Sequence, residues 1–364
     1  MGVIAERHVA QLDADDIYVS TYVGIAELLL GGCTTSTDNL YVHPKPGFID
    51  AEIRAANEIG FRFYPTRGAM NLSRKDGALA SDRVAQPTEV IVEDYRQVIE
   101  KYHDASPGAL TRVGLSPTAL FTNDSALNRA TVEMSDRYDV RIHTHLAEER
   151  DEIEYCQETF GSTPVEYFVR QGLATNRTWV AHFGYPTESE AELLAGLGVG
   201  VSHCPSSNML VAGGTARVQF LRSLGMAVGL GCDGSASTDH ASMWQEARTA
   251  LLVGRFRDGP ETMTARDVLD VATRGSAQCL GWDDEIGHLK VGALADLVAW
   301  DMDEVSMAGA HTDALEALLR CGPAKAWLTM VQGRPLVAEG QLTLPALSEA
   351  LEHHRSASRR LQGL

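Results

Sequence analysis

Short β-branched segments alternate with amphipathic helical segments along most of this sequence of 364 residues. The first helical segment, Asp15 to Leu30, opens on acidic residues and stops at two glycines, which are ordinary start and stop signals. Parallel strands need a long crossover between them, and that crossover is usually a helix. The alternation therefore predicts a parallel α/β sheet, with strands at residues 33–39, 61–66, 111–117, 140–148, 178–183, 199–204 and 226–234.

Seven strands fit an open doubly wound sheet, whereas a closed barrel of this kind has eight. Because the chain opens on a helix, we predict a (β/α)8 TIM-type barrel that lacks its first strand. Strands and tight turns with little helix follow at residues 287–301 and 326–342, and they predict a small partial β-domain. The predicted domains are 1–282 for the barrel (strands 2 to 8), 283–345 for the small β-sandwich portion and 346–364 for a C-terminal helix or tail.

The formal net charge is −18, from 31 basic and 49 acidic side chains. Such a field repels polyanions, so we expect no nucleic-acid partner. No apolar run is long enough to cross a bilayer, and the N-terminal residues are too charged for a signal peptide. The six cysteines are scattered, which is typical of reduced thiols. We therefore expect a cytoplasmic protein without a membrane partner.

Ionisable and hydroxyl side chains cluster at the carboxyl ends of the predicted strands. Active sites of such barrels lie at these ends, because the loops that follow the strands meet there. We therefore expect a site built from some of these residues: Asp38, Arg67, Ser116, His143, His145, Glu148, His182, His203 and Asp233.

The segment HTHLAE, residues 143–148, is the richest of these strand ends. His143 and His145 share one face of a strand, and Glu148 falls where the strand gives way to a helix. Neutral imidazole is a good metal ligand, and a nearby carboxylate can shuttle protons for an attacking water. The alternative is a pair of core histidines followed by an acid at a helix N-terminus.

The later strand ends allow two interpretations each. His182 and His203 could be structural, and Asp233 could ligate a metal, accept a proton or cap the following turn. The stretch Gly229 to Gly234 formally matches the dinucleotide pattern G-x-G-x-x-G. That pattern belongs in an early βαβ unit with an acid about 20 residues further on, so we reject a nucleotide site here.

The motifs HTHLAE, WVAHFG, VSHCPSSNM and LGCDGSAS, in this order and spacing, resemble the amidohydrolase superfamily. More narrowly, they resemble its aminohydrolases acting on purine, pyrimidine and triazine rings. The stretches AELLLGGCTTSTDNLYVHP, RFYPTRGAM and CGPAKAWLTMVQGRPLV resemble 8-oxoguanine deaminases and hydroxyatrazine-type hydrolases. The resemblance covers nearly the whole chain.

The resemblance implies one divalent metal, zinc or iron, with His145 and Asp233 among its ligands. It also implies that Asp233 is the general base, that Glu148 handles the ring-nitrogen proton and that His182 holds or polarises the attacked centre. Arg67 would contact a ring carbonyl. Catalytic residues would thus be Glu148, His182 and Asp233, and substrate-binding residues Arg67, His182 and Glu148.

The reaction that this resemblance implies is hydrolysis of a cyclic C–N bond in a small heterocycle. The expected case is deamination of an oxopurine, as in 8-oxoguanine deaminases. A triazine or isocytosine-type aminohydrolase is the alternative, and so is a catalytically inactive fragment or pseudo-enzyme that only binds ligand. We also expect a homo-oligomer.

The sequence departs from the family pattern at the metal ligands. An H-x-H pair is expected after the first strand, but residues 1–15 contain only His8. A catalytic zinc normally has three protein ligands, so we expect the chain as given to be impaired. The sequence could be a fragment of a longer protein, which we favour, a ligand-binding pseudo-enzyme, or a chain in which other groups supply the ligands. Tyr185 also stands where relatives often have histidine.

Overall fold

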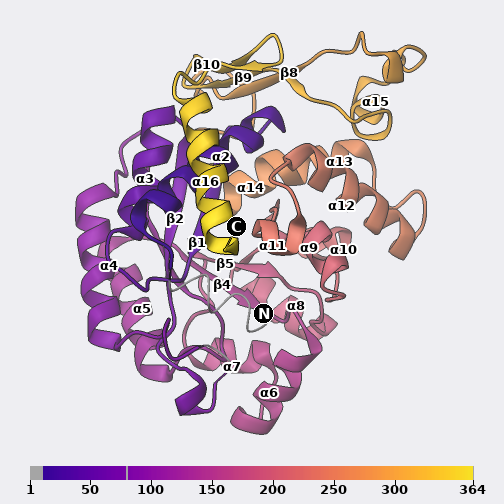
Figure 1. Cartoon of the computed structure of the whole chain (residues 1–364). Coiled ribbons are helices and arrows are strands. Elements are labelled where there is room, and N and C mark those ends of the chain that lie inside the picture. The colour runs from indigo at the N-terminus through magenta and orange to yellow at the C-terminus, as the bar shows by residue number, and fades with distance from the viewer. Residues whose placement is uncertain (1–10, 79–80, 364) are drawn as a thin grey trace.

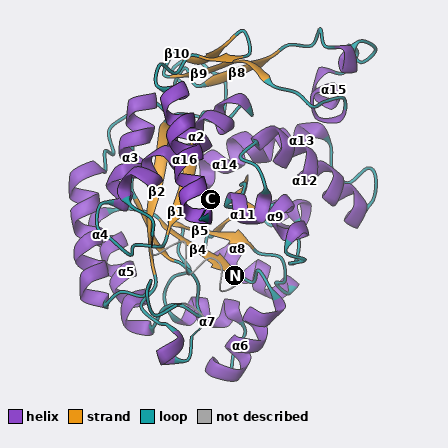
Figure 2. Ribbon diagram, in the orientation of Figure 1, coloured by secondary structure: helices purple, strands orange, loops and turns teal. Residues whose placement is uncertain are grey.

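The computed structural model describes residues 11–78 and 81–363 and contains a seven-stranded parallel sheet at its centre (Figures 1 and 2). The strands pair in sequence order from β1 to β7, and among the described residues β1 and β7 are the two edges. This confirms the predicted curled α/β barrel sheet of seven strands. The strands are β1 (Thr35–Leu40), β2 (Arg62–Ala69), β3 (Gly114–Pro117), β4 (Ile142–Leu146), β5 (Thr178–His182), β6 (Gly200–His203) and β7 (Val228–Leu230).

Helices surround this sheet, with a helical segment after each strand (Figure 2). They are α2 (Ala14–Leu30), α3 (Phe48–Ile59), α4 (Thr88–Tyr102), α5 (Ser125–Tyr138), α6 (Arg150–Phe160), α7 (Pro164–Arg170), α8 (Glu188–Gly196), α9 (Pro205–Leu210), α10 (Val218–Ser223), α11 (Ser235–Thr238), α12 (Met243–Asp258), α13 (Ala265–Asp270), α14 (Ser276–Leu280), α15 (Ala314–Arg320) and α16 (Leu347–Gln362). Three short segments, η1 (Arg74–Asp76), η2 (Val271–Gly275) and η3 (Val305–Met307), complete the helical elements of the described residues. In the described part of the chain, no helix has the length and apolar character needed to span a bilayer.

Local signals explain where the helices begin and end. The Asp13 carboxylate accepts the backbone N–H groups of Asp15 and Asp16, and the Asp16 carboxylate accepts the N–H of Asp13 in return. This reciprocal cap satisfies donors that the first turn of α2 would otherwise leave free. Gly31 ends α2. Most strands of the parallel sheet are short and buried on both faces, as β2 and β5 show along their whole length, which is typical of a parallel sheet covered by helices. The edge strand β1 is partly exposed.

The C-terminal strands form a separate antiparallel sheet in the order β11-β10-β9-β8. These strands are β8 (Leu297–Trp300), β9 (Ala326–Val331), β10 (Arg334–Ala338) and β11 (Gln341–Leu342). The β9–β10 turn is made by Gln332 and Gly333, both with positive φ, as in the tight turns that match the strand twist. The terminal helix α16 runs along α2, and Arg360 pairs with Asp16.

A buried ion pair joins the two sheets. Arg62 begins β2, and its Nε lies 2.6 Å from Oδ2 of Asp296, with both side chains almost fully buried. Oδ1 of Asp296 also accepts the backbone N–H of Gln332 at 2.8 Å. One carboxylate therefore ties the parallel sheet to the β9–β10 turn.

Replacing Asp296 with alanine is expected to lower the free energy of unfolding by about 3 kcal/mol, because the Arg62 cation would stay buried without its partner. Urea unfolding monitored by circular dichroism measures this change. Glu188→Ala is the matched control, since its partner Arg217 is half exposed, and exposed pairs contribute less than about 1 kcal/mol. Equal losses in the two variants would contradict the prediction.

Candidate active site

The end of β4 carries His145 and leads to Glu148 through a left-handed residue, Ala147, with φ of 51°. The Nδ1 atom of His145 lies 2.7 Å from the carbonyl oxygen of Thr118. A carbonyl can only accept, so Nδ1 carries the proton and Nε2 keeps a free lone pair. Glu148 is held through its backbone, because its N–H donates to Oε2 of Glu152 at 2.9 Å.

The end of β5 carries His182, which is 1% exposed. Its Nε2 atom lies 3.5 Å from Oε1 of Glu148, and its Nδ1 atom lies 3.1 Å from Oδ1 of Asn208. Burial lowers the pKa of His182 below its ordinary value, although the Glu148 carboxylate opposes that shift. The ring is therefore neutral near pH 7.

Asp233 follows β7, and its carboxylate is anchored on both oxygens. Oδ2 accepts the Ser207 hydroxyl at 2.6 Å, and Oδ1 accepts the N–H of Gly234 at 2.7 Å. Burial pushes the pKa of Asp233 upward, but the Ser207 hydroxyl, His182 and the Gly234 N–H together hold it below the ordinary value. Asp233 is thus an anion poised as a ligand or proton acceptor.

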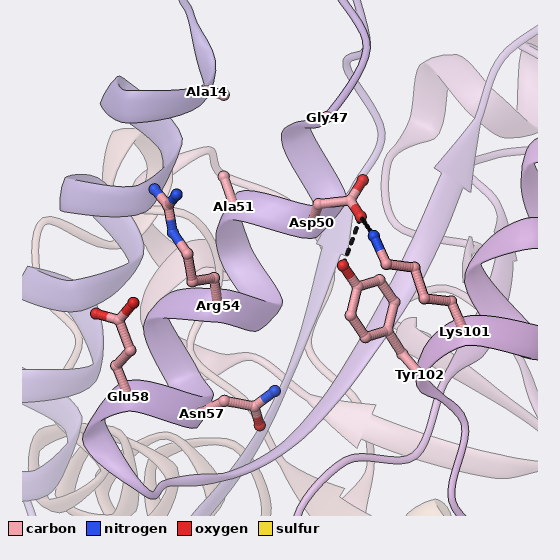
Figure 3. Close-up of a pocket in the computed structure, with 9 residues that line it drawn as sticks. All are labelled: Ala14, Gly47, Asp50, Ala51, Arg54, Asn57, Glu58, Lys101 and Tyr102. Atoms are coloured by element: carbon pink, nitrogen blue, oxygen red, sulfur yellow. Dashed lines mark hydrogen bonds and ion pairs between the residues drawn. The ribbon is translucent and has the colours of Figure 1, made fainter.

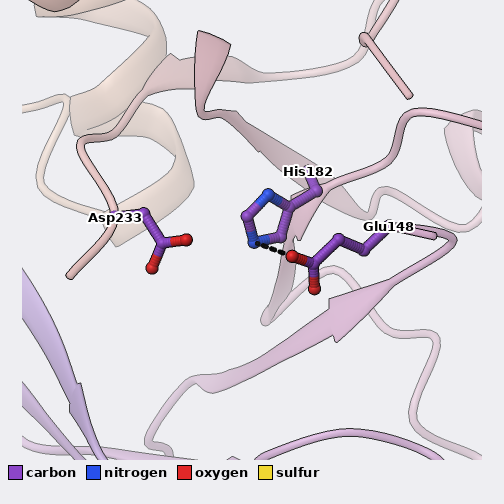
Figure 4. Close-up of side chains that lie close together, drawn as sticks. All are labelled: Glu148, His182 and Asp233. Carbon is purple, nitrogen blue, oxygen red and sulfur yellow. Dashed lines mark ion pairs between the residues drawn. The ribbon is translucent and has the colours of Figure 1, made fainter. Parts of the chain in front are cut away.

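The structure brings Glu148, His182 and Asp233 together, with one ligand atom of each lying within 4.8 Å of the others (Figure 4). Two carboxylates and a neutral imidazole are ligand types that zinc and other divalent metals accept. The residues therefore fit a metal ion. His145 lies beside this group, and its ring stacks on that of His182 with 5.4 Å between centroids.

The structure groups Asp233, one of the two predicted metal ligands, with Glu148 and His182. His145, the other predicted ligand, lies beside this group, and the assignment of both as ligands stays a prediction. His8, the only histidine of residues 1–15, lies outside the described residues.

Other candidates have structural surroundings. The Arg67 guanidinium is buried, with Nε on Asp94 and Nη2 on Gln86, both at 2.7 Å, and Nη1 on the Gly68 carbonyl. The guanidinium N–H groups thus donate to protein oxygens, which argues against the predicted contact of Arg67 to a ring carbonyl of the substrate.

His143 and His203 are buried, and burial lowers the pKa of each to about 3. His143 also stacks on Trp179 with 5.0 Å between centroids. The stacking on Trp179 favours the structural interpretation of His143. Ser116 and Asp38 are not among the ligand atoms that come together.

Two residues of the site were not predicted from the sequence. Ser207 and Asn208 lie on α9, directly after β6, and both are 1% exposed. They belong to the stretch VSHCPSSNM, in which only His203 was singled out. A run of small polar residues opening a helix at the carboxyl end of a strand was the available signal.

A separate cleft of about 520 Å³ lies among the helices, and Glu148, His182 and Asp233 are not among its lining residues (Figure 3). It is lined by residues of α2, α3 and α4. Asp50 accepts from both Lys101 and Tyr102 within it, so these charged and polar groups already satisfy one another.

Behind the site, α9 is capped by a fully buried acid, Glu246 of α12. Oε2 of Glu246 accepts the N–H of Ser206 at 3.2 Å, and Oε1 lies 3.6 Å from Nε2 of His240. Burial raises the pKa of Glu246 to about 7, although hydrogen bonds from Ser206 oppose the shift. The folded protein therefore holds this proton more tightly than the unfolded chain.

Because the folded-state pKa is raised, the stabilisation from this proton is complete below about pH 4.5 and is lost as the pH rises through about 7. Glu246→Gln, which cannot ionise, should therefore gain stability relative to the wild type between pH 5 and pH 8, by on the order of 2–3 kcal/mol. Urea unfolding at the two pH values measures the difference. Replacement of the exposed Glu192 by glutamine is the control. If the free energies of unfolding of Glu246→Gln and the wild type differ by the same amount at pH 5 and at pH 8, the expectation is refuted.

Comparisons with known proteins show which family this chain belongs to. The chain matches the amidohydrolase family over residues 4–334. It is 40% identical to an 8-oxoguanine deaminase of Pseudomonas aeruginosa over 351 residues, which cover 96% of this chain and 78% of that protein. It is 29% identical to a hydroxydechloroatrazine ethylaminohydrolase of Pseudomonas sp. over 347 residues, which cover 93% of this chain and 71% of that protein.

A solved structure extends the similarity to three dimensions. The atrazine chlorohydrolase of Arthrobacter aurescens, crystallised with zinc, superposes with a TM-score of 0.91 at 31% identity, over 95% of this chain and 77% of that one. The expected family is thereby confirmed, and the zinc of this relative agrees with a donor group that could hold a metal. The chain belongs to the amidohydrolase family.

Proposed function

We propose that this protein is a metal-dependent aminohydrolase that deaminates an oxopurine of the 8-oxoguanine class. The convergence of Glu148, His182 and Asp233 within 4.8 Å is the observation that carries the chemistry. The 40% identity to an 8-oxoguanine deaminase supports the choice of substrate class. The partner of the site is thus a small heterocycle.

The site can hold a divalent metal through Asp233, His145 and His182. In both His145 and His182 the Nδ1 atom is hydrogen-bonded to a protein oxygen, so that the lone pair of each Nε2 atom can bind a metal. Metal-binding histidines usually have this arrangement. When bound, the metal supplies Lewis-acid activation of the attacking water.

The carboxylates of Asp233 and Glu148 each carry out one proton transfer. Deamination adds water to the amino-bearing ring carbon, breaks the C–N bond and releases ammonia. Asp233, whose pKa is held low, accepts a proton from the water. Glu148, whose Oε1 atom lies 3.5 Å from Nε2 of His182, delivers a proton to the ring nitrogen or to the departing amine.

Ammonia release tests this proposal. The purified protein is loaded with zinc and incubated with 8-oxoguanine, isocytosine and an alkylamino-hydroxytriazine. Ammonia released from 8-oxoguanine at a higher kcat/KM than any amine from the other two is the expected result. A faster reaction with the triazine would support the alternative suggested by the hydroxydechloroatrazine relative. Binding of 8-oxoguanine without ammonia release would overturn the enzymatic proposal and support a ligand-binding protein.

A further inference from the structure

We propose that Ser207 and Asn208 are positioning residues that fix Asp233 and His182 relative to each other. The inference rests on the proposed function, since it concerns the same site. It follows from a juxtaposition: neighbouring residues of the single short helix α9 hold side chains from two strand ends, β5 and β7.

Ser207 holds Asp233. Its hydroxyl donates to Oδ2 of that carboxylate at 2.6 Å, and Ser207 is 1% exposed. A buried hydroxyl that donates to an anion makes a short, strong bond with little freedom to rotate. This bond fixes one oxygen of Asp233 and so determines the direction of its remaining lone pairs.

Asn208 holds His182 and sets its tautomer. Nδ2 of Asn208 donates to the Gly214 carbonyl, so Oδ1 faces Nδ1 of His182. An amide oxygen can only accept, and Nδ1 must therefore carry the proton. The Nε2 lone pair is left to face Glu148.

The same amide connects His182 to the segment that carries Glu148. The N–H of Gly214 donates to the carbonyl of Glu148 at 3.2 Å. The backbones of Gly184 and Gly214 touch so closely that a Cβ on Gly184 would lie 2.4 Å from the Gly214 carbonyl carbon. Asn208 therefore bridges the loops after β4 and β5 through Gly214.

Backbone strain explains why such a bridge is needed. His182 and Phe183 have φ values of 69° and 49°, and Ala147 has 51°. Residues with side chains are strained in this left-handed region and persist there only where surrounding contacts determine their conformation. The Phe183 N–H donates to the Leu146 carbonyl at 3.2 Å, and Asn208 supplies one side-chain contact to His182.

The test compares Ser207→Ala, Ser207→Thr and Asn208→Ala with Ser206→Ala as the matched control. Ser206 is the neighbour of Ser207 on α9, but its hydroxyl bonds to Thr249 instead of the site. Zinc affinity is measured by competition with a chromophoric chelator, and the His182 tautomer by two-bond proton–nitrogen NMR of the metal-free protein. Thermal unfolding shows that each variant is folded.

Ser207→Ala is expected to weaken zinc binding at least about tenfold, as losses of groups that orient ligands do. Ser207→Thr should retain the zinc affinity of the wild type, and Ser206→Ala should stay within about threefold of it. Asn208→Ala should convert His182 from the Nδ1–H tautomer to a mixture. Unchanged zinc affinity in Ser207→Ala, or an unchanged tautomer in folded Asn208→Ala, would overturn the corresponding half of the proposal. A wild-type protein that binds no zinc would contradict the metal-dependent function, whereas the tautomer measurement would still decide the role of Asn208.

Discussion

Asp233→Asn is expected to lower kcat/KM for ammonia release by at least about a thousandfold, because the amide removes both a metal ligand and the proton acceptor at once. The asparagine can keep the hydrogen bond from Ser207, so the local fold should persist. The loss should therefore appear together with weaker zinc binding, measured by chelator competition, and with an unchanged circular dichroism spectrum.

Asp239→Asn is the control for this prediction. Asp239 is an exposed aspartate six residues further along the same segment, just after α11. It should retain activity within about threefold of the wild type, as exposed substitutions away from a site generally have small effects. Asp233→Asn that kept more than a tenth of wild-type kcat/KM would show that Asp233 is not the acceptor.

The fold could be predicted because its signals are local. The helix from Asp13 to Gly31 is marked by acids that cap its first turn and by a glycine that ends it. The short buried strands alternate with such helices, and the sequential order β1 to β7 follows from joining parallel strands by helices. Even the convergence of Glu148, His182 and Asp233 is a consequence of topology, since the carboxyl ends of parallel strands meet at one rim.

The parts that escaped prediction depend on partners that no local pattern reveals. Arg67 was expected to face a substrate, but it is committed to Asp94 on α4 and to Gln86, which approach only once the chain has folded. Likewise, nothing in the spacing indicates that Asn208 contacts His182, 26 residues earlier.

Backbone conformation escaped prediction for the same reason. The left-handed φ of His182 lies outside what a β-strand pattern predicts. Strain of this kind is tolerated where several contacts converge, so it is found only after those contacts are known.

Glu148→Gln is expected to lower kcat by about a hundredfold to ten-thousandfold with little change in zinc affinity, because glutamine fills the same space and cannot carry a proton. Glu148 is partly exposed beside buried His182, so it can exchange protons with solvent between turnovers. The backbone bond from its N–H to Glu152 is unaffected by the change. Steady-state kinetics of ammonia release, with zinc content measured on the same samples, separates lost proton transfer from lost metal.

The adjacent Glu149→Gln is the natural control, since Glu149 is an exposed N-cap residue of α6 with no side-chain cap bond. It changes the net charge by the same amount and should retain kcat within about threefold. The two outcomes distinguish the role of one carboxylate from a general effect of charge. If Glu148→Gln also loses its zinc, this carboxylate acts chiefly as a metal ligand, and another group must deliver the proton. If both variants remain fully active, Glu148 is neither a metal ligand nor the proton donor.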